Sequence, residues 1–200
     1  MAHAGEVLRK SVHLGSVVIP VAAVFVDKQI LVPVLLAVAV TLLIVDVLKV
    51  KNKPFKRFFL AVFGKMLRER EVEGGMTAST IVVASSALTL LLFRTEIAIT
   101  ALVFLSVGDS FAALIGRHFG TIKLVGERTL EGSLAALNAC LFASVILISL
   151  NPLLGWKLSS IALLAGSVAA ALAELLNLPL DDNLRIPIIA GTVMELIIPG

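Results

Sequence analysis

The sequence predicts an all-α bundle of membrane-spanning helices. Of its 200 residues, 58% are hydrophobic and 16% are charged, whereas soluble domains are typically about 45–50% apolar and about 25% charged. The mean hydropathy is +1.04, and apolar runs recur along the whole chain. This composition excludes a disordered chain, a basic nucleic-acid-binding arm and an ordinary cytosolic enzyme. We therefore expect one integral-membrane catalytic domain over residues 1–200, with the lipid bilayer and no nucleic acid as partner.

Seven apolar runs mark the expected spans, since about 20 apolar residues cross a bilayer as a helix. The basic pair Arg9-Lys10 precedes the first run as in a signal peptide, but Pro20 and the lack of a small-residue cleavage motif favour a retained helix. The last run is short and contains Pro187, which allows a broken or re-entrant segment. The runs cover residues 12–26, 30–48, 77–93, 96–115, 133–150, 158–176 and 184–198.

Between the second and third runs lies the one long polar stretch, residues 49–75. It mixes basic residues with large apolar ones in the sequence KNKPFKRFFLAVFGKMLRER. Bases on one face of a helix and apolar side chains on the other are typical of a helix that lies in the membrane interface. We therefore expect an amphipathic interfacial helix beside the seven spans.

The basic residues indicate the orientation of the chain. Fourteen of the 17 lysines and arginines lie before the first span or after the second, fourth and sixth, and the other connections hold only Lys28, Arg94 and Lys157. Lysine and arginine collect on the cytoplasmic side of membrane proteins. This alternation predicts a multi-pass protein with a cytoplasmic N-terminus, and so compact a chain suits a prokaryotic plasma membrane.

Ionisable residues near the span ends are candidates for function, because placing one within a span costs about 2.5–3.5 kcal/mol. Asp46 can instead pair with Lys49 one turn on, and Glu195, near the opposite face, is expected to be interfacial with no role. The candidates all fall at predicted cytoplasmic ends: His13, Asp46, Asp109 and Glu174.

The most informative segment is residues 107–133, which reads VGDSFAALIGRHFGTIKLVGERTLEGS. On a helix, Ala113, Gly116 and Gly120 fall within about 40° of Asp109. Small residues let another helix or a ligand approach the backbone closely. A helix-packing stripe explains the small residues but not the acid.

Basic side chains follow this face in a glycine-punctuated loop, and Glu131-Gly132-Ser133 then opens the next span. Ser133 can cap that helix, whose N-terminus attracts phosphate. Bases and exposed amides suit a polyphosphate, and a carboxylate beside them suits Mg²⁺. An ordinary basic cytoplasmic loop is the alternative. The bases are Arg117, Lys123 and Arg128.

A second segment, ELLNLPLDDNLRIP, covers residues 174–187, and Pro179 ends the sixth span within it. Asp181, Asp182 and Asn183 then lie in a short turn. Two adjacent acids can ligate a metal or accept a hydroxyl proton. The alternative is an Asx turn with Asn183 as the N-cap of the last helix.

A third segment, residues 69–80, places Gly74-Gly75 before Thr77, Ser79 and Thr80. It either forms a helix N-terminus that receives phosphate or is a flexible loop with capping hydroxyls. The single cysteine, Cys140, excludes an intrachain disulfide, and there is no Cys/His zinc spacing. Walker, HRD, DFG and GxSxG motifs are also absent.

These segments resemble the CTP-dependent polyprenol kinase family, which includes dolichol kinase, phytol kinase and CTP-using diacylglycerol kinase and is related to phosphatidate cytidylyltransferases. The resemblance covers nearly the whole chain. It begins with RKSVH at residues 9–13, is most specific at GDSFAALIGRHFG (108–120) and ERTLEGS (127–133), and resumes at Glu174 and DDNLRIP (181–187). The family usually has Lys-Ser or Lys-Thr before EGS, where this chain has Arg128-Thr129.

The resemblance implies transfer of the γ-phosphate of CTP to the hydroxyl of a long-chain lipid alcohol such as a polyprenol, at the cytoplasmic face. It implies Mg²⁺ on Asp109 and on Asp182, with Asp181 or Asp182 as metal ligand or general base. Glu131 is a second acidic ligand or a loop anchor. His13, Glu174 and Asn183 support the site. The expected nucleotide-binding residues are Gly116, Arg117, Gly120, Lys123, Arg128, Gly132 and Ser133.

Two alternatives stay open. A cytidylyltransferase would use the same CTP and metal, but a lipid phosphate would attack the α-phosphate. A small transporter would also contain an intramembrane acid, although transporter sites lie near the bilayer midplane between inverted repeats and no repeat is visible here. The small-residue faces can pack within one chain or between two, which leaves a homo-oligomer open.

Overall fold

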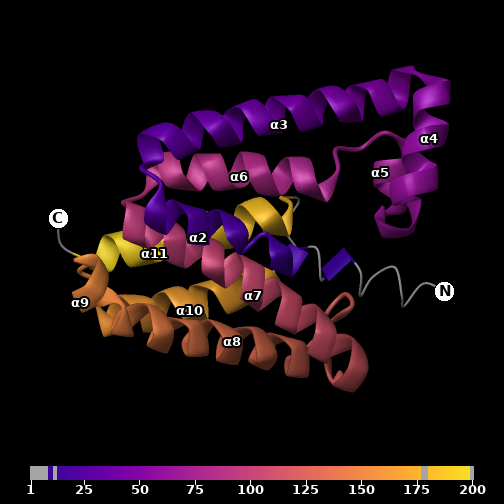
Figure 1. The fold of residues 1–200 in the computed structure, drawn as a ribbon. Helices are drawn as coiled ribbons and strands as arrows, with labels where there is room; N and C mark the ends of the chain where they lie inside the picture. Colours follow the sequence, from indigo (N-terminus) through magenta and orange to yellow (C-terminus); the bar gives the residue numbers. More distant parts are fainter. Residues whose placement is uncertain (1–8, 11–12, 177–179, 199–200) are drawn as a thin grey trace.

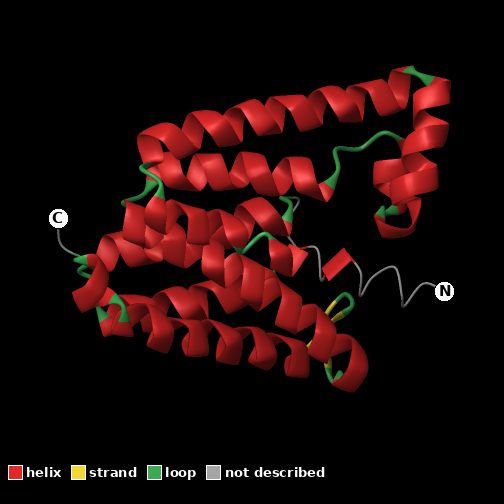
Figure 2. Ribbon diagram, viewed as in Figure 1, coloured by secondary structure: helices red, strands yellow, loops and turns green. Residues whose placement is uncertain are grey.

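The computed structural model describes residues 9–10, 13–176 and 180–198, almost all of them helical (Figure 2). A helix lies at each of the seven predicted runs, although residue 12 and Pro179, used to bound two of them, lie outside the described residues. These helices are α2 (Val18–Phe25), α3 (Lys28–Lys51), α6 (Ala78–Leu92), α7 (Thr95–Phe119), α8 (Leu130–Ser149), α10 (Ser160–Leu175) and α11 (Asp182–Ile197).

Among the described residues, α3, α7 and α8 are the three helices long and apolar enough to cross a membrane. The others are shorter: α10 and α11 have 16 residues each, and such a helix extends about 24 Å at 1.5 Å per residue, less than the hydrocarbon core of about 30 Å. The all-α fold and the membrane character are thus confirmed. About seven spans are not.

Helix α7 lies at the centre of the bundle and packs against α8, α11, α2 and α10. In its most apolar stretch 72% of the residues are buried, against 28% for α3. The side chains of Ile97, Leu102 and Phe104 form the core. The outer side of α3 instead exposes Val34 and Val40. An apolar helix with so exposed a face is suited to lipid rather than to water.

Between α3 and α6 the chain forms α4 (Lys53–Phe63), the 3₁₀ turn η1 (Gly64–Met66) and α5 (Glu69–Glu73). Asn52 caps α4 by accepting a hydrogen bond from Phe55 N. Figure 1 shows α4 running across the end of α3. The predicted amphipathic helix is therefore present, and its place in a membrane interface stays a prediction.

Pro187 does not break the last helix, although the sequence allows a break there. Helix α11 runs without interruption through Pro187. Proline has no N–H, so the carbonyl of Asn183 one turn earlier lacks its helical donor. The Ser85 hydroxyl of α6 donates to that carbonyl at 2.7 Å. A side chain from a neighbouring helix thus replaces the missing bond.

The segment after α7 also differs from the predicted loop. Helix α7 continues to Phe119, so Arg117 lies in its last turn. Strands β1 (Lys123–Val125) and β2 (Arg128–Thr129) then form a short antiparallel hairpin. Gly126 has φ +57° in the hairpin turn, a conformation that glycine adopts at no steric cost. After α8, α9 (Asn151–Leu154) adds one helical turn.

The connections fall into two groups at opposite ends of the bundle (Figure 1). The α3–α6 and α7–α8 connections, the end of α10 and the start of α11 share one end with Arg9 and Lys10, and the other connections share the opposite end. The fold thus gathers most of the basic residues at one end of the bundle. Which side of a membrane this end faces stays a prediction.

Candidate functional site

Two cavities lie side by side at the basic end of the bundle. The first, the polar cavity, has a volume of about 670 Å³ and lies between the end of α7, the hairpin, the start of α8 and the α10–α11 connection. Six bases and four acids line it. Ten of the predicted site residues are among its lining: Asp109, Gly116, Arg117, Gly120, Lys123, Arg128, Gly132, Ser133, Glu174 and Asp182.

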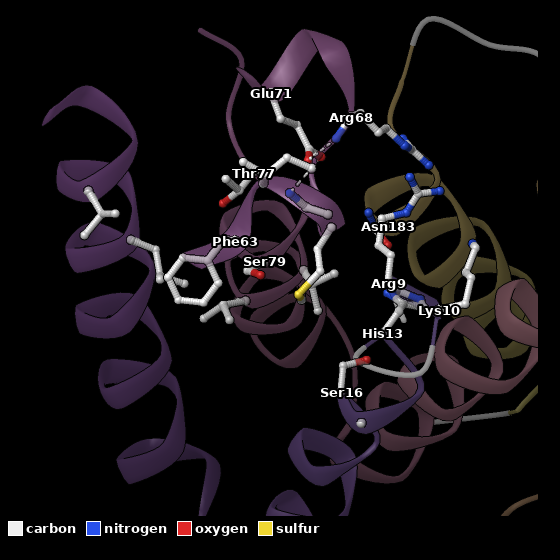
Figure 3. A pocket seen from close by; sticks show the side chains of 18 of the residues that line it. Arg9, Lys10, His13, Ser16, Phe63, Arg68, Glu71, Thr77, Ser79 and Asn183 are labelled. Carbon is white, nitrogen blue, oxygen red and sulfur yellow. Dashed lines mark hydrogen bonds between the residues drawn. The ribbon is translucent and has the colours of Figure 1, made fainter. Parts of the chain in front are cut away.

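The second, the apolar cavity, has a volume of about 420 Å³ and lies between α2, α3, α4 and α6. Figure 3 shows Arg9, Lys10, His13 and Arg68 on one side of it and Phe63 and Thr77 on the other. Its other walls are mainly hydrocarbon, from Ile19, Leu42, Val45, Phe59, Met66, Leu67, Val82 and Val83. Of the predicted site residues, His13 and Asn183 line this cavity with Asp109.

Asp109 lies in the wall that separates the two cavities and lines both. Its side chain is buried on α7. Lys10 Nζ lies 2.5 Å from Asp109 Oδ2, and His13 Nε2 lies 3.2 Å from the same oxygen. Arg9, Lys10 and Arg68 also line both cavities. A carboxylate among several bases is thus accessible from a charged compartment and from an apolar one.

Sequence reasoning missed these three bases as site residues. Arg9 and Lys10 enter the sequence analysis as charges before the first span and as part of the RKSVH motif, with no site role, and Arg68 enters as part of the interfacial helix. One available signal was the spacing of Lys10 and His13, which are three residues apart and thus share a helix face. Arg68 carries no comparable signal, because the fold of α4, η1 and α5 brings it back to the site.

The predicted glycine face is a contact between helices. A Cβ on Gly132 would lie 2.8 Å from Ala112 O and 3.2 Å from Gly116 Cα, and a Cβ on Gly116 would lie 3.0 Å from Thr129 Oγ1. Helices α7 and α8 therefore approach at Gly116 and Gly132 more closely than side chains permit. These glycines also line the polar cavity, where they leave backbone accessible.

Helix α8 begins at Leu130, earlier than predicted, and its cap is Thr129, not Ser133. Thr129 Oγ1 accepts a hydrogen bond from Gly132 N at 3.2 Å. The Ser133 hydroxyl lines the polar cavity and is buried, and within the described part of the chain it has no hydrogen-bond partner.

Glu131 is a loop anchor. Its carboxylate accepts hydrogen bonds from Thr121 N at 3.0 Å, from the Thr121 hydroxyl and from Ile122 N, and it lines neither cavity. Of the two roles expected for Glu131, the geometry supports this one. The bonds fix the chain between α7 and the hairpin.

Arg128 links the hairpin to α10 and α11. Its Nε lies 3.2 Å from Glu174 Oε1, its Nη2 donates to Asp182 at 2.9 Å, and its Nη1 donates to Leu176 O at 2.7 Å. Asp182 also pairs with Arg185. The guanidinium expected on phosphate is therefore largely engaged by protein groups, and Asp182 lies between two arginines. This arrangement suits a structural role more than a general base.

Asp181, not Asn183, is the N-cap of α11. Its Oδ1 accepts hydrogen bonds from Asn183 N at 3.1 Å and from Asn183 Nδ2 at 2.7 Å. Its Oδ2 lies 2.7 Å from Arg70 Nη2, which ties α11 to α5. Asp181 lines neither cavity.

The N-terminus of α6, for which the sequence leaves open a phosphate site or a loop with capping hydroxyls, is capped by carboxylates. Asp46 accepts hydrogen bonds from Thr77 N at 2.9 Å and from Thr80 Oγ1 at 2.7 Å. Glu71 Oε1 accepts from Ala78 N at 3.2 Å. The expected pair of Asp46 with Lys49 is confirmed at 3.0 Å. These bonds fix α6 against α3.

Within the described residues, no three His, Cys, Asp or Glu side chains converge to form a metal site. Mg²⁺ bound with a nucleotide needs only one or two carboxylates besides the phosphates. Asp109 and Glu174, which line the polar cavity, fit that requirement. The cavity suits a polyphosphate with its cation rather than an all-protein metal centre.

Comparisons with known proteins give distant similarities. An uncharacterized protein of Rickettsia prowazekii is 26% identical over 187 residues, which cover 92% of this chain and 90% of that protein. CTP-dependent diacylglycerol kinase 1 of Schizosaccharomyces pombe is 28% identical over 163 residues, which cover 76% of this chain and 74% of that protein. No family model and no solved structure matches the chain. The second similarity supports a relationship with CTP-dependent lipid kinases.

Proposed function

We propose that the protein is a CTP-dependent lipid-alcohol kinase that forms a lipid phosphate and CDP. The observation that carries this proposal is the common wall of the two cavities, where Asp109 and three bases are accessible from both sides. A reaction between a charged nucleotide and an apolar alcohol needs such a boundary. The similarity to the fission-yeast enzyme supports the same donor.

The polar cavity is the proposed nucleotide site. Its bases outnumber its acids, and several of them, including Arg117, lie around backbone that the glycines leave accessible. Positive charge and accessible amides stabilise phosphate oxygens. The unpaired Ser133 hydroxyl supplies a further donor there. Because Arg128 is engaged by Glu174 and Asp182, we assign the phosphates to Arg9, Lys10, Arg68, Arg117 and Lys123.

The apolar cavity is the proposed acceptor site. A lipid alcohol that enters it from the bilayer would place its chain beside Ile19 and Leu42 and its hydroxyl near Asp109 and His13, all of which line that cavity. Exclusion of water by the hydrocarbon walls limits hydrolysis of the nucleotide. The acceptor we propose is a polyprenol, and diacylglycerol, named for the fission-yeast relative, is its direct competitor in the test.

The proposed step is an in-line transfer. The alcohol oxygen forms a bond to the γ-phosphorus of CTP while the bond to the β-phosphate oxygen breaks, and CDP leaves with that electron pair. The hydroxyl proton passes to the Asp109 carboxylate, which His13 holds from one side. Lys10 neutralises charge on the transferred group. Such transfers depend chiefly on positioning and charge neutralisation.

Magnesium would be held by Asp109 and the CTP phosphates, with Glu174 nearby in the same cavity, and when bound it neutralises phosphate charge. The metal roles expected of Asp181 and Asp182 are not part of this proposal, because Asp181 lines neither cavity and the Asp182 carboxylate is held between two arginines. We further propose that the basic end faces the cytoplasm of a prokaryotic cell, where CTP is available.

The test is a labelling experiment with purified protein, Mg²⁺, a polyprenol, diacylglycerol and phosphatidate. CTP carries its label at the α-phosphate in one arm and at the γ-phosphate in the other. Label from the γ-position in a lipid supports the kinase, and chromatography identifies the acceptor. Label from the α-position would instead establish a cytidylyltransferase, and absence of labelling with both CTP and ATP would overturn the proposal.

A further inference from the structure

The stretch from residue 47 to residue 68 contains seven bases and no acid. Two of these bases have other roles: Lys49 is buried against Asp46, and Arg68 lines both cavities. The remaining five lie on or beside α4, and in the described part of the chain no carboxylate pairs with any of them. They are Lys51, Lys53, Lys56, Arg57 and Lys65, which we call the α4 bases.

Helix α4 separates these bases from an apolar face. At 100° per residue, Lys53, Lys56 and Arg57 share one side. The other side holds Phe55, Phe58, Phe59 and Val62, and Phe63 lies at its edge next to Lys56. Phe58 is 66% exposed and Val62 is 55% exposed. Exposed phenylalanine and valine side chains are unfavourable in water. Beside a row of lysines, they match the boundary between headgroups and acyl chains.

The inner edge of the same apolar face belongs to the apolar cavity, which Phe59 and Phe63 line. The rings of Phe55, Phe59 and Phe63 follow one another along α4 with centroid separations of 6.1 Å and 5.0 Å. Lys49 Nζ lies 5.7 Å from the centroid of the Phe59 ring. A shift in the position of α4 therefore moves a wall of the apolar cavity.

We propose that α4 is a docking surface for the anionic headgroups of the bilayer. The α4 bases bind the headgroups, and Phe58 and Val62 insert among the upper acyl chains. The orientation agrees, because α4 runs across the end of α3, a helix long and apolar enough to span (Figure 1). Clusters of four to eight bases on an amphipathic helix next to a span are typical of binding to anionic lipid.

Charge selects this occupant over a second copy of the chain. Two α4 surfaces in contact would bring ten bases together without a described acid between them, and like charges repel. An anionic bilayer supplies both the counter-charge and the apolar layer. Helix α4 also forms one wall of the apolar cavity. Anionic lipid bound to α4 would therefore hold this wall in position beside the path by which an acceptor enters from the bilayer.

The experiment measures the depth of α4 directly and does not need turnover. The protein carries Phe58→Trp with Trp156→Phe and is reconstituted into phosphatidylcholine vesicles with or without phosphatidylglycerol, both brominated on the upper acyl positions. We expect quenching of the new tryptophan to be about twofold stronger with the anionic lipid, and to fall at about 1 M salt, where the screening length is about 3 Å.

Two variants provide the matched comparison. Changing Lys53, Lys56 and Arg57 to glutamine should remove the dependence on anionic lipid. Phe142→Trp in the same Trp156→Phe background should be quenched equally in both vesicles, because Phe142 is 70% exposed on α8, which is long and apolar enough to span. The proposal would be overturned if quenching of the tryptophan at position 58 did not depend on lipid charge or on salt. Loss of that quenching at high protein density would also overturn it, because it would indicate that a second copy of the chain covers α4. Neither result depends on kinase activity.

Discussion

The polar and apolar cavities share one wall but are built from the chain in different ways. The polar cavity takes most of its lining from one continuous stretch, residues 109–133. The apolar cavity is assembled from four stretches, residues 9–10 with 13–19, 42–45, 59–71 and 77–83, and from two single residues, Asp109 of α7 and Asn183 of α11. The charged lining of the polar cavity thus comes mainly from one local segment. The hydrocarbon lining of the apolar cavity is formed by the packing of helices that are distant in the sequence.

This difference indicates which part of the chain would determine specificity for the nucleotide and which part would determine specificity for the lipid. Phosphate recognition depends on a few donors and accessible amides, which a short segment can supply. A hydrocarbon chain offers no such groups, so its binding depends on the shape enclosed by several helices. Changes to the wall should disable both sites, and changes to one cavity should affect one substrate alone.

The largest effect is expected for Asp109→Asn, which removes the acid common to both cavities. We expect kcat for phosphate transfer from CTP to fall by about 10²–10⁴-fold, while the protein stays folded. Labelled-lipid formation and thermal unfolding measure the two quantities. Glu195→Gln, which alters an acid paired with Arg94 away from both cavities, is the matched control. Near-normal turnover in the Asp109 variant would refute the assigned role.

The next effect separates the acceptor from the donor. Ser79 lines the apolar cavity and is exposed there (Figure 3), so Ser79→Phe fills space without disturbing a packed core. We expect about tenfold slower transfer to a long-chain alcohol and unchanged CTP binding. Ala84→Phe adds the same ring on the exposed side of α6, outside the cavity. Equal losses in both variants would argue against an acceptor site in this cavity.

Substitution of two bases of the polar cavity should have different effects, one on the KM for CTP and the other on stability. Lys123 has an exposed side chain whose described partner is Glu127, so Lys123→Gln should raise the KM for CTP about threefold without changing stability. Arg128→Gln leaves Glu174 and Asp182 without their partner and should lower the free energy of unfolding by about 3 kcal/mol. CTP titration and denaturant unfolding separate these results. Matching changes in both variants would show that Arg128 is primarily a phosphate ligand.

The smallest effects on activity are expected from two glycines. Gly132→Ala places a methyl group 2.8 Å from Ala112 O and should destabilise the α7–α8 contact by about 1–3 kcal/mol. Gly126 has open space around its Cβ position and φ +57°, so Gly126→Ala should cost only about 1 kcal/mol. Thermal unfolding of the two variants measures which substitution destabilises the protein more. A larger loss at Gly126 would show that the hairpin turn, not the helix contact, governs this region.

Several elements could be predicted because their causes are local. Apolar runs located seven helices, and the mixed basic and aromatic stretch located α4. Asp109 and the polar-cavity residues between 109 and 133 were recognisable because the segment from 108 to 133 carries acid, bases and glycines close together. The pairing of Asp46 with Lys49 follows from their helical spacing.

Other features required the tertiary structure. Pro187 allows a break, but Ser85 of another helix satisfies the carbonyl that proline leaves unpaired. The bases assigned to phosphate look alike in the sequence, yet Arg128 meets Glu174 and Asp182 only because α10 and α11 lie beside the hairpin. Arg68 reaches the site only through the fold of α4, η1 and α5.

The sequence by itself therefore determined that this is a helical membrane protein, and it predicted that the bases gather at one end with a glycine-rich segment that carries Asp109 among them. Composition and periodicity are properties of neighbouring residues, so they are readable without a fold. Only the tertiary structure decided which charges neutralise one another, and that a cavity with apolar walls meets the polar one at Asp109. Those outcomes depend on distances between segments as much as 100 residues apart, and helical periodicity does not encode such distances.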